Sequence, residues 1–409
     1  MLLLLLACPP KHLGLRRVQL ETFDYAWSRV EEAHYDEDMN GIDWDAVYEE
    51  LRPQARKART NAELRPVLVE MFSRLGDSHY GVMPRELAEG MPGPESVVGN
   101  GELDLDLRLV DGRVVVVRSG QDQVGLGWVL VRLGATDLSQ WLVDRETLDE
   151  RDIEFRLQHL VRNGLPGSLV EATFLDGEDA EVQVELAWRA KSGETASIGN
   201  LPTFFVDIRS ESLEEGQVQL YAFNGFFPPI LPPWEELVAR TKESEAAGII
   251  IDLRGNPGGV SGLSVGMASF LVAEKGHVLG TMTSRDSTFR FLVTPRPSKQ
   301  RFEGPVAVLI DAMSASTSEI LAGGLQGIGR ARVFGETSAG MALPSTIETL
   351  PNGDLMQLVL ADLVGPKGER IEGHGVTPDE PVPMTREALL AGTDPVVHAA
   401  LSWILEPEE

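Results

Sequence analysis

Three serines alternate along one short segment of the chain, at Ser314, Ser316 and Ser318. The apolar residues 306–310 before them predict a buried strand, and the apolar residues 320–325 after them predict a helix that begins near Ser316. A hydroxyl at this place lies beside the partly positive N–H groups of a helix start, which suits an oxygen that develops negative charge. Serine is also an ordinary helix cap, so this segment alone leaves both a nucleophile and a cap open.

Other segments add to this pattern. Residues 248–252 predict a second buried strand, and the glycine-rich turn 255–259 follows it directly. Further along come Gly335-Glu336-Thr337-Ser338-Ala339-Gly340 and Ile371-Glu372-Gly373-His374-Gly375-Val376-Thr377-Pro378-Asp379, while Leu75-Gly76-Asp77-Ser78-His79 lies near the start. In this order and spacing the segments resemble the S41 serine peptidases: C-terminal processing proteases, tricorn core-like proteases and retinoid-binding-protein relatives. The resemblance covers roughly residues 20–385.

The resemblance implies the nucleophile and the groups that would stabilise its oxyanion. It places the nucleophile at Ser316, and the oxyanion donors at the N–H of Thr317 and at a glycine N–H from Gly258 and Gly259. Glycine suits this role because a backbone without Cβ can come close to a substrate. An ordinary strand-to-helix turn remains the alternative for the two glycines.

One position departs from the family pattern. In the processing proteases a lysine, the general base for the serine, stands where this chain has Met341, between Gly340 and Ala342. Methionine has no titratable proton, so a Ser–Lys dyad cannot form there. We therefore expect either a different base or a protein that no longer cuts.

Histidine is the natural replacement, because its unperturbed pKa of about 6.5 lets it accept and return a proton near neutrality. His79 resembles the catalytic histidine of the tricorn core-like proteases, which pair it with a glutamate at the position that Glu372 occupies here. The expected triad is Ser316, His79 and Glu372. A structural role for His79, a base at His374 and a base at Lys367 stay as alternatives.

Composition limits the classes of partner and cofactor. The chain has 409 residues, 43% of them hydrophobic and 24% charged, which is typical of a globular protein. Its net charge of -27 argues against nucleic acids and anionic membranes and favours basic or neutral substrates. We expect no metal and no cofactor, since the histidines lack ligand spacing and there is one cysteine.

That cysteine, Cys8, follows an apolar run from Leu2 to Ala7. The run resembles the end of a bacterial lipoprotein signal, with the cysteine lipidated after cleavage, and it is too short to span a bilayer. We expect a protein on the periplasmic side of a bacterial cell envelope, with Cys8 as its anchor. A fortuitous leucine-rich start on a cytosolic protein is the alternative.

The periodicity of the chain changes from helical, through short alternating strands, to alternating strands and helices. We predict an α/β protein with an N-terminal helical bundle, a β-rich domain in which residues 125–134 resemble a PDZ core, and a ClpP/crotonase-like α/β protease core. The predicted boundaries are as follows: a signal-like segment at 1–17, the helical bundle at 18–90, the PDZ-like domain at 97–190, the peptidase core at 195–388 and a tail at 389–409.

The sequence therefore predicts a serine endopeptidase of the C-terminal processing type, acting on peptides or unfolded proteins with a Ser–His–Glu triad. The alternative is an S41-fold protein that binds peptides or apolar ligands without cutting them. Met341 favours this alternative, whereas Ser316 and the glycine-rich turn favour the enzyme.

Overall fold

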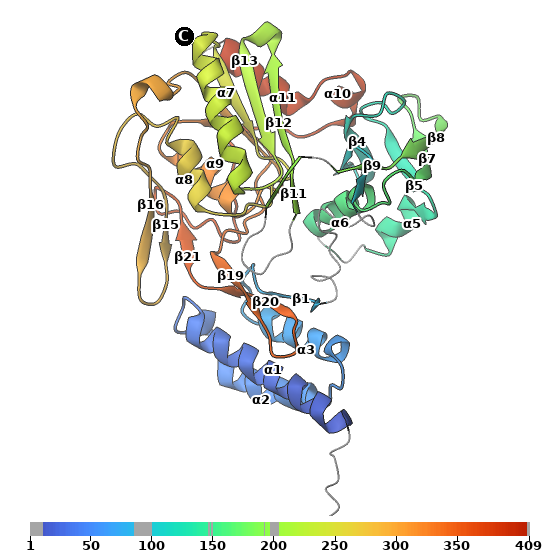
Figure 1. Cartoon of the computed structure of the whole chain (residues 1–409), viewed down its shortest axis with the longest axis vertical. Helices are drawn as coiled ribbons and strands as arrows, with labels where there is room; N and C mark the ends of the chain where they lie inside the picture. Colours follow the sequence, from blue (N-terminus) through green and yellow to red (C-terminus); the bar gives the residue numbers. More distant parts are fainter. Residues whose placement is uncertain are drawn as a thin grey trace, which may run out of the picture.

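The computed structural model describes residues 11–85, 100–145, 148, 150–191, 193–196 and 204–406. Figure 1 shows three regions: N-terminal helices at the bottom, a helix-covered sheet above them, and a smaller β-rich region at the right. The signal-like segment 1–10, with Cys8, lies outside the described residues, as do residues 86–99. Within the described part, no helix combines the length and apolarity that crossing a bilayer requires.

The N-terminal region consists of α1 (Lys11–Ala33), α2 (Trp44–Ala55) and α3 (Asn61–Ser73), with the short η1 (Met39–Gly41) between the first two. Capping side chains start two of these helices: Asp43 accepts a hydrogen bond from the N–H of Ala46, and Thr60 accepts one from the N–H of Glu63. The apolar faces of the three helices share one core.

A small sheet from both ends of the chain completes that core. It has the order β1 (Gly81–Met83), β20 (Leu355–Val359) and β19 (Ser345–Thr349), with antiparallel pairing throughout. Met356 and Leu358 are buried among the helices, and Arg65 of α3 pairs with Asp354 at 2.8 Å. Residues from the C-terminal half thus belong to the N-terminal core. A domain defined as one continuous stretch of sequence leaves these residues out.

The β-rich region is an antiparallel sheet with two helices. The strands are β3 (Leu105–Val110), β4 (Arg113–Ser119), β5 (Val129–Leu133), β7 (Leu169–Leu175) and β8 (Glu181–Ala187) in that order, with β6 (Thr136–Asp137) beside β5. A turn at Asp111 and Gly112 joins β3 to β4, and these residues have positive φ angles of 51° and 72°, respectively. Helices α5 (Leu138–Val143) and α6 (Glu150–Arg162) accompany the sheet, and α6 lies along the edge strand β3.

The helix-covered sheet has the strand order β12 (Ile208–Leu213), β13 (Val218–Phe223), β14 (Gly248–Asp252), β17 (Val306–Ile310), β18 (Arg332–Gly335) and β22 (Glu380–Pro381). Every pair except β12–β13 is parallel. Ile249 and Ile251 face a core with α7 (Leu231–Glu243), α8 (Gly262–Ala268) and α9 (Thr317–Gly327). Ile250 faces the opposite core with α11 (Pro395–Leu405), so the central strands are buried on both faces.

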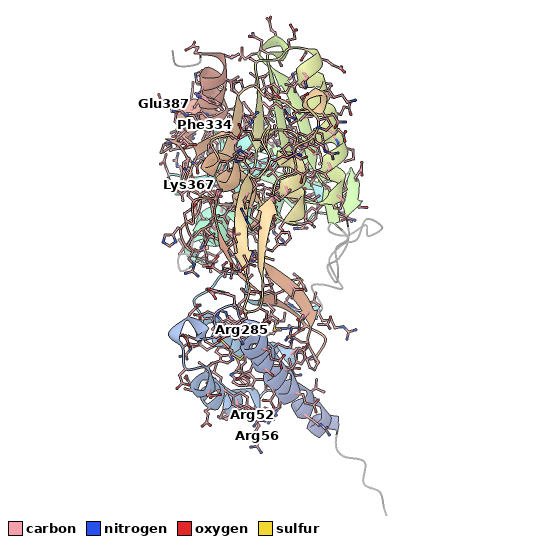
Figure 2. All side chains as sticks on the ribbon, turned by 90° about the vertical axis from the view of Figure 1, so that its left-hand side faces the viewer. Arg52, Arg56, Arg285, Phe334, Lys367 and Glu387 are labelled. Atoms are coloured by element: carbon pink, nitrogen blue, oxygen red, sulfur yellow. The ribbon has the colours of Figure 1, made fainter. Side chains whose placement is uncertain are left out.

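The remaining elements are short. They are β2 (Gly101–Glu102) with β9 (Arg189–Ala190), β10 (Glu194–Ala196) with β11 (Phe204–Val206), the sheet β16 (Thr288–Leu292), β15 (Val278–Thr283) and β21 (Asp362–Val364), helix α10 (Arg386–Leu390), and the 3-10 turns η2 (Glu214–Gly216), η3 (Pro228–Ile230) and η4 (Ser298–Gln300). The β15–β16 hairpin reaches down to the N-terminal helices, and Figure 2 shows Arg285 of its turn at that junction.

The predicted α/β class and the N-terminal helices are confirmed, and strands 248–252 and 306–310 have the predicted bounds. Helix α8 ends at Ala268. Beyond it, the carbonyls of Ser269 and Phe270 accept hydrogen bonds from Arg296 and Phe302 of another segment, which replaces helical bonding. The predicted tail contains α11, whose residues Val396, Ala400 and Ile404 are buried against the sheet.

Candidate active site

Ser316 lies between the end of β17 and the start of α9, at the carboxyl edge of the parallel sheet. Its φ of 55° and ψ of -113° are unusual for a residue other than glycine. The N–H of Ser316 faces two acceptors, the carbonyl of Met341 at 2.8 Å and Oε2 of Glu319 at 2.9 Å. Such backbone strain persists only where surrounding contacts hold it, and it is frequent at catalytic residues.

Glu319 is the group that holds this turn. Its carboxylate is fully buried and accepts hydrogen bonds from the N–H groups of Ser316, Gly340 and Met341 and from the hydroxyl of Ser338. Burial raises the pKa of Glu319, and these hydrogen bonds act in the opposite direction. Glu319 therefore connects the turn that carries Ser316 to segment 338–341.

The other two serines of the motif have structural roles. The hydroxyl of Ser314 donates to the carbonyl of Leu253 at 2.8 Å, and that of Ser318 donates to the carbonyl of Asn256 at 2.9 Å. Both side chains are buried, whereas Ser316 is partly exposed. The middle serine is thus the one that a substrate could reach.

The glycine-rich turn packs directly against Ser316. A Cβ atom on Gly258 would lie 2.8 Å from the Cβ of Ser316 and 2.8 Å from the N of Thr317, so no side chain fits there. The N–H of Gly258 donates to Oδ1 of Asn256 at 2.9 Å. Among the described residues, neither the N–H of Gly259 nor that of Thr317 donates a hydrogen bond, which leaves both free for an oxyanion.

A second cluster joins His79, Ser78 and Glu372. Nδ1 of His79 lies 2.7 Å from the hydroxyl oxygen of Ser78, and that hydroxyl lies 3.0 Å from Oε2 of Glu372. The N–H of Ser78 also donates to Oε1 of Glu372 at 2.8 Å. Sequence reasoning named His79 and Glu372 but missed Ser78, whose only signal was a hydroxyl next to the candidate base.

These contacts define which nitrogen of His79 carries the proton. A carboxylate oxygen only accepts, so the Ser78 hydroxyl gives its one proton to Glu372. The same hydroxyl can then only accept from His79, which requires an N–H at Nδ1. Nε2 is left with a free lone pair, as a general base requires.

Burial lowers the pKa of His79, and the charge of Glu372 raises it to a smaller extent. The imidazole is therefore neutral at neutral pH. His79 also has a φ of 62°, so strained backbone occurs at both the candidate base and the candidate nucleophile.

Two consecutive residues connect the halves of the site. The carbonyl of Met341 accepts the N–H of Ser316, and the N–H of Ala342 donates to Oε2 of Glu372 at 2.9 Å. Met341, which stands in the lysine position, thus supports the site through its main chain, which any residue supplies. Within the described residues no hydrogen bond joins His79 to Ser316, and in free enzymes such bonds are commonly long until substrate binds.

The alternative bases have other surroundings. His374 is exposed, and its Nδ1 lies 2.9 Å from the carbonyl oxygen of Glu372. Lys367 is also exposed, and Figure 2 shows it at the margin of the upper region. Neither residue has the buried link to a carboxylate that His79 has.

Two stretches of the chain are similar to known protein families. Residues 216–382 match the model of peptidase family S41, and residues 19–73 match the tricorn protease C1 domain. A probable CtpA-like serine protease of Staphylococcus epidermidis is 26% identical over 175 residues, which are 42% of this chain and 35% of that protein. The corresponding protein of Staphylococcus saprophyticus is 24% identical over 172 residues, with the same shares. The chain thus spans about a third of the length of these curated relatives.

Solved structures show the same fold. The photosystem II D1 C-terminal processing protease has a TM-score of 0.58 at 20% identity, over 91% of this chain and 96% of that one. A mature CPAF complexed with lactacystin has a TM-score of 0.59 at 14% identity, over 97% and 100% of the two chains. The stretch 216–382, which contains Ser316, Glu372 and the glycine-rich turn, is thus the part of the chain that is similar to peptidase family S41.

Proposed function

We propose that the protein is a serine endopeptidase of the processing type, with Ser316 as nucleophile and His79 as general base. The observation that carries this proposal is the hydrogen-bonded series from His79 through Ser78 to Glu372. It supplies a base of defined tautomer in a chain whose lysine position holds Met341. Glu372 completes the site as the acceptor that orients Ser78.

In this mechanism Nε2 of His79 takes the proton of Ser316 as the hydroxyl oxygen attacks the scissile carbonyl. The oxyanion that forms accepts hydrogen bonds from the N–H groups of Thr317 and Gly259. His79 then returns the proton to the departing amine, and an acyl-enzyme remains. Water, deprotonated by the same imidazole, hydrolyses the ester and restores Ser316.

The substrate class follows from charge and from the relatives. The staphylococcal proteins are named as probable CtpA-like serine proteases. We propose that this chain has the same type of activity and that its substrates are peptides or unfolded proteins. The net charge of -27 favours basic or neutral chains over acidic ones.

A PDZ-like role for the β-rich region stays a prediction. A peptide that adds as a strand would pair with the outer edge of β3, which faces α6. In the structure two side chains of α6 occupy that edge: Gln158 donates to the carbonyl of Leu107 at 2.6 Å, and Glu154 accepts from the N–H of Leu109 at 3.0 Å. A peptide that adds to β3 must displace both side chains.

We further propose that the protein acts at the bacterial cell envelope, held by a lipid on Cys8. The apolar run before Cys8 supports this location, since it resembles the end of a lipoprotein signal. The acidic chain has little attraction to an anionic membrane surface without such an anchor.

The test of function is labelling with a fluorophosphonate together with digestion of fluorescein-labelled casein. We expect the wild-type protein to be labelled and to digest casein, and Ser316→Ala to abolish both. Ser73→Ala is the control, because the one bond of its hydroxyl within the described residues goes to the carbonyl of Glu70 on α3. A folded wild-type protein that shows neither reaction supports the non-cutting binder instead.

A further inference from the structure

A polar cluster lies directly behind the candidate base. Its members come from three parts of the chain: Tyr35 and Asn40 follow α1, Asp77 follows α3, and Arg370 follows β21. Asp77 immediately precedes Ser78, and Arg370 stands shortly before Glu372 in the sequence. The cluster therefore touches both segments that the Ser78–Glu372 contact must bring together.

Asp77 is the centre of the cluster. Its side chain is 4% exposed. The hydroxyl of Tyr35 donates to its Oδ1 at 3.2 Å, and the amide of Asn40 donates to its Oδ2 at 3.0 Å. The same amide group also donates to the carbonyl of Leu75 at 3.0 Å, so Asn40 holds the segment before Ser78 at two points.

Tyr35 connects this segment to the one that carries Glu372. Arg370 donates from Nη2 to the hydroxyl oxygen of Tyr35 at 3.0 Å, and its guanidinium lies 3.9 Å from Oδ1 of Asp77. Burial raises the pKa of Tyr35, so the hydroxyl keeps the proton that it donates to Asp77. A single hydroxyl thus binds one residue from each of the two segments.

The backbone next to Tyr35 is also held by a contact from the β15–β16 hairpin. Arg285, in the turn of the β15–β16 hairpin, donates to the carbonyl of His34 at 2.5 Å, at the junction that Figure 2 shows. His34 is fully buried, and its Nε2 lies 3.5 Å from Oδ2 of Asp77. The N-terminal helices therefore meet the S41 domain through residues next to the candidate base.

We propose that Tyr35, Asp77 and Arg370 are positioning residues that hold Ser78 and His79 in register with Glu372. This inference rests on the proposed function and assigns a catalytic purpose to the contact between the N-terminal helices and the S41 domain. The physical reason is geometric: Ser78 must accept from His79 and donate to Glu372 at once, and a catalytic group displaced by about 1 Å can lose about a hundredfold in rate.

The chain offers a matched control on the same helix. Tyr25 of α1 donates to Oε2 of Glu348 at 3.1 Å, and Arg29 donates to the same carboxylate at 2.8 Å. This second tyrosine–carboxylate–arginine cluster joins α1 to β19 and contacts none of the candidate catalytic residues. Tyr25→Phe therefore removes the same kind of bond as Tyr35→Phe, at a site without a link to Ser78.

The experiment measures kcat and KM for casein digestion by the full chain. We expect Tyr35→Phe to lower kcat about tenfold, the effect of one lost hydrogen bond on a rate, with KM within about twofold of wild type. Tyr25→Phe should leave both parameters within about twofold. If Tyr35→Phe does not fold, Arg370→Gln is measured instead. The side chain of Arg370 is 46% exposed, so its replacement should be tolerated, and the change removes the hydrogen bond from Arg370 to the hydroxyl of Tyr35.

A second readout separates positioning from simple loss of stability. In a Ser78→Ala background, Tyr35→Phe should change kcat by less than about twofold, because the group through which it acts is already gone. Equal losses in both backgrounds, or an equal loss in Tyr25→Phe, would overturn the positioning role. If the wild-type protein is active and Tyr35→Phe has the same activity, only the positioning role is refuted. If the wild-type protein is neither labelled nor digests casein, the proposed function and the positioning role are refuted together.

Discussion

The hydroxyl of Ser78 can be removed without disturbing the carboxylate that it contacts. In Ser78→Ala, Oε1 of Glu372 keeps the N–H of residue 78 at 2.8 Å, and Oε2 keeps the N–H of Ala342 at 2.9 Å. Glu372 therefore stays in place, and the change falls on His79. Its Nδ1 loses the acceptor that fixed the ring and its tautomer.

The size of the effect follows from the two bonds that are lost. A hydrogen bond between neutral groups contributes about 0.5–1.5 kcal/mol, and one to a charged group about 1.5–3 kcal/mol. Loss of both from the transition state amounts to about 2–4 kcal/mol, which corresponds to roughly 30- to 1,000-fold in kcat. The same two bonds exist in the free enzyme, so the free energy of unfolding should fall by no more than this range, and the backbone contacts of Glu372 should keep the fold intact.

The assay is casein digestion by Ser78→Ala, Ser78→Thr and the control Ser73→Ala, with thermal unfolding measured in parallel. Ser78→Thr keeps a hydroxyl and should retain most of the wild-type kcat, whereas Ser78→Ala should show the full loss with an unchanged KM. A kcat for Ser78→Ala within about threefold of wild type would refute the hydrogen-bonded series from His79 to Glu372 as the source of the base.

Three further predictions concern the base, the glycine-rich turn and the anchor. Burial holds the pKa of His79 below 6.5 in the free enzyme, and only the neutral ring accepts a proton, so kcat/KM should fall with decreasing pH along a limb centred below pH 6.5. Glu372→Gln removes a charge that raises this pKa and should move the limb to still lower pH in a profile of kcat/KM against pH. Gly258→Ala should lower kcat by at least about a hundredfold, since its Cβ would lie 2.8 Å from that of Ser316 at a φ of 97°. Gly262→Ala should be tolerated in the same assay, because its Cβ would have no described atom within 4 Å apart from its chain neighbours and its own helix backbone. In membrane fractionation, the wild-type protein should partition into detergent and Cys8→Ala should not, with equal activity on casein; recovery of wild type in the cytosol with its first seven residues intact would contradict the anchor.

Local pattern was sufficient to predict much of the core. The uninterrupted apolar runs 248–252 and 306–310 are strands buried on both faces, and the polar residues after them stand at the carboxyl edge, where the sheet leaves room for a site. The turn at Asp111 and Gly112 and the cap at Thr60 have local signatures as well, because turn and capping bonds join residues only a few positions apart.

The N-terminal core shows where this reasoning fails. Nothing local indicates that β20, at residues 355–359, packs in one core with α1, α2 and α3. A strand exposes one apolar face whatever it later covers, so its pattern identifies the face and leaves its partner undefined. The partner depends on how the whole chain folds back on itself.

The sequence by itself determined the types of residue at the site: a serine at a helix start, a glycine-rich turn, a histidine and a glutamate, with methionine in place of lysine. The tertiary structure alone decided how they connect, since Ser78 and Glu372 are 294 positions apart and meet within 3.0 Å. Ser78 acquired a role only through that contact, and Tyr35 only through its contact with Asp77 and Arg370. Periodicity and capping act over a few residues, whereas these contacts depend on three packed regions holding distant segments in one geometry.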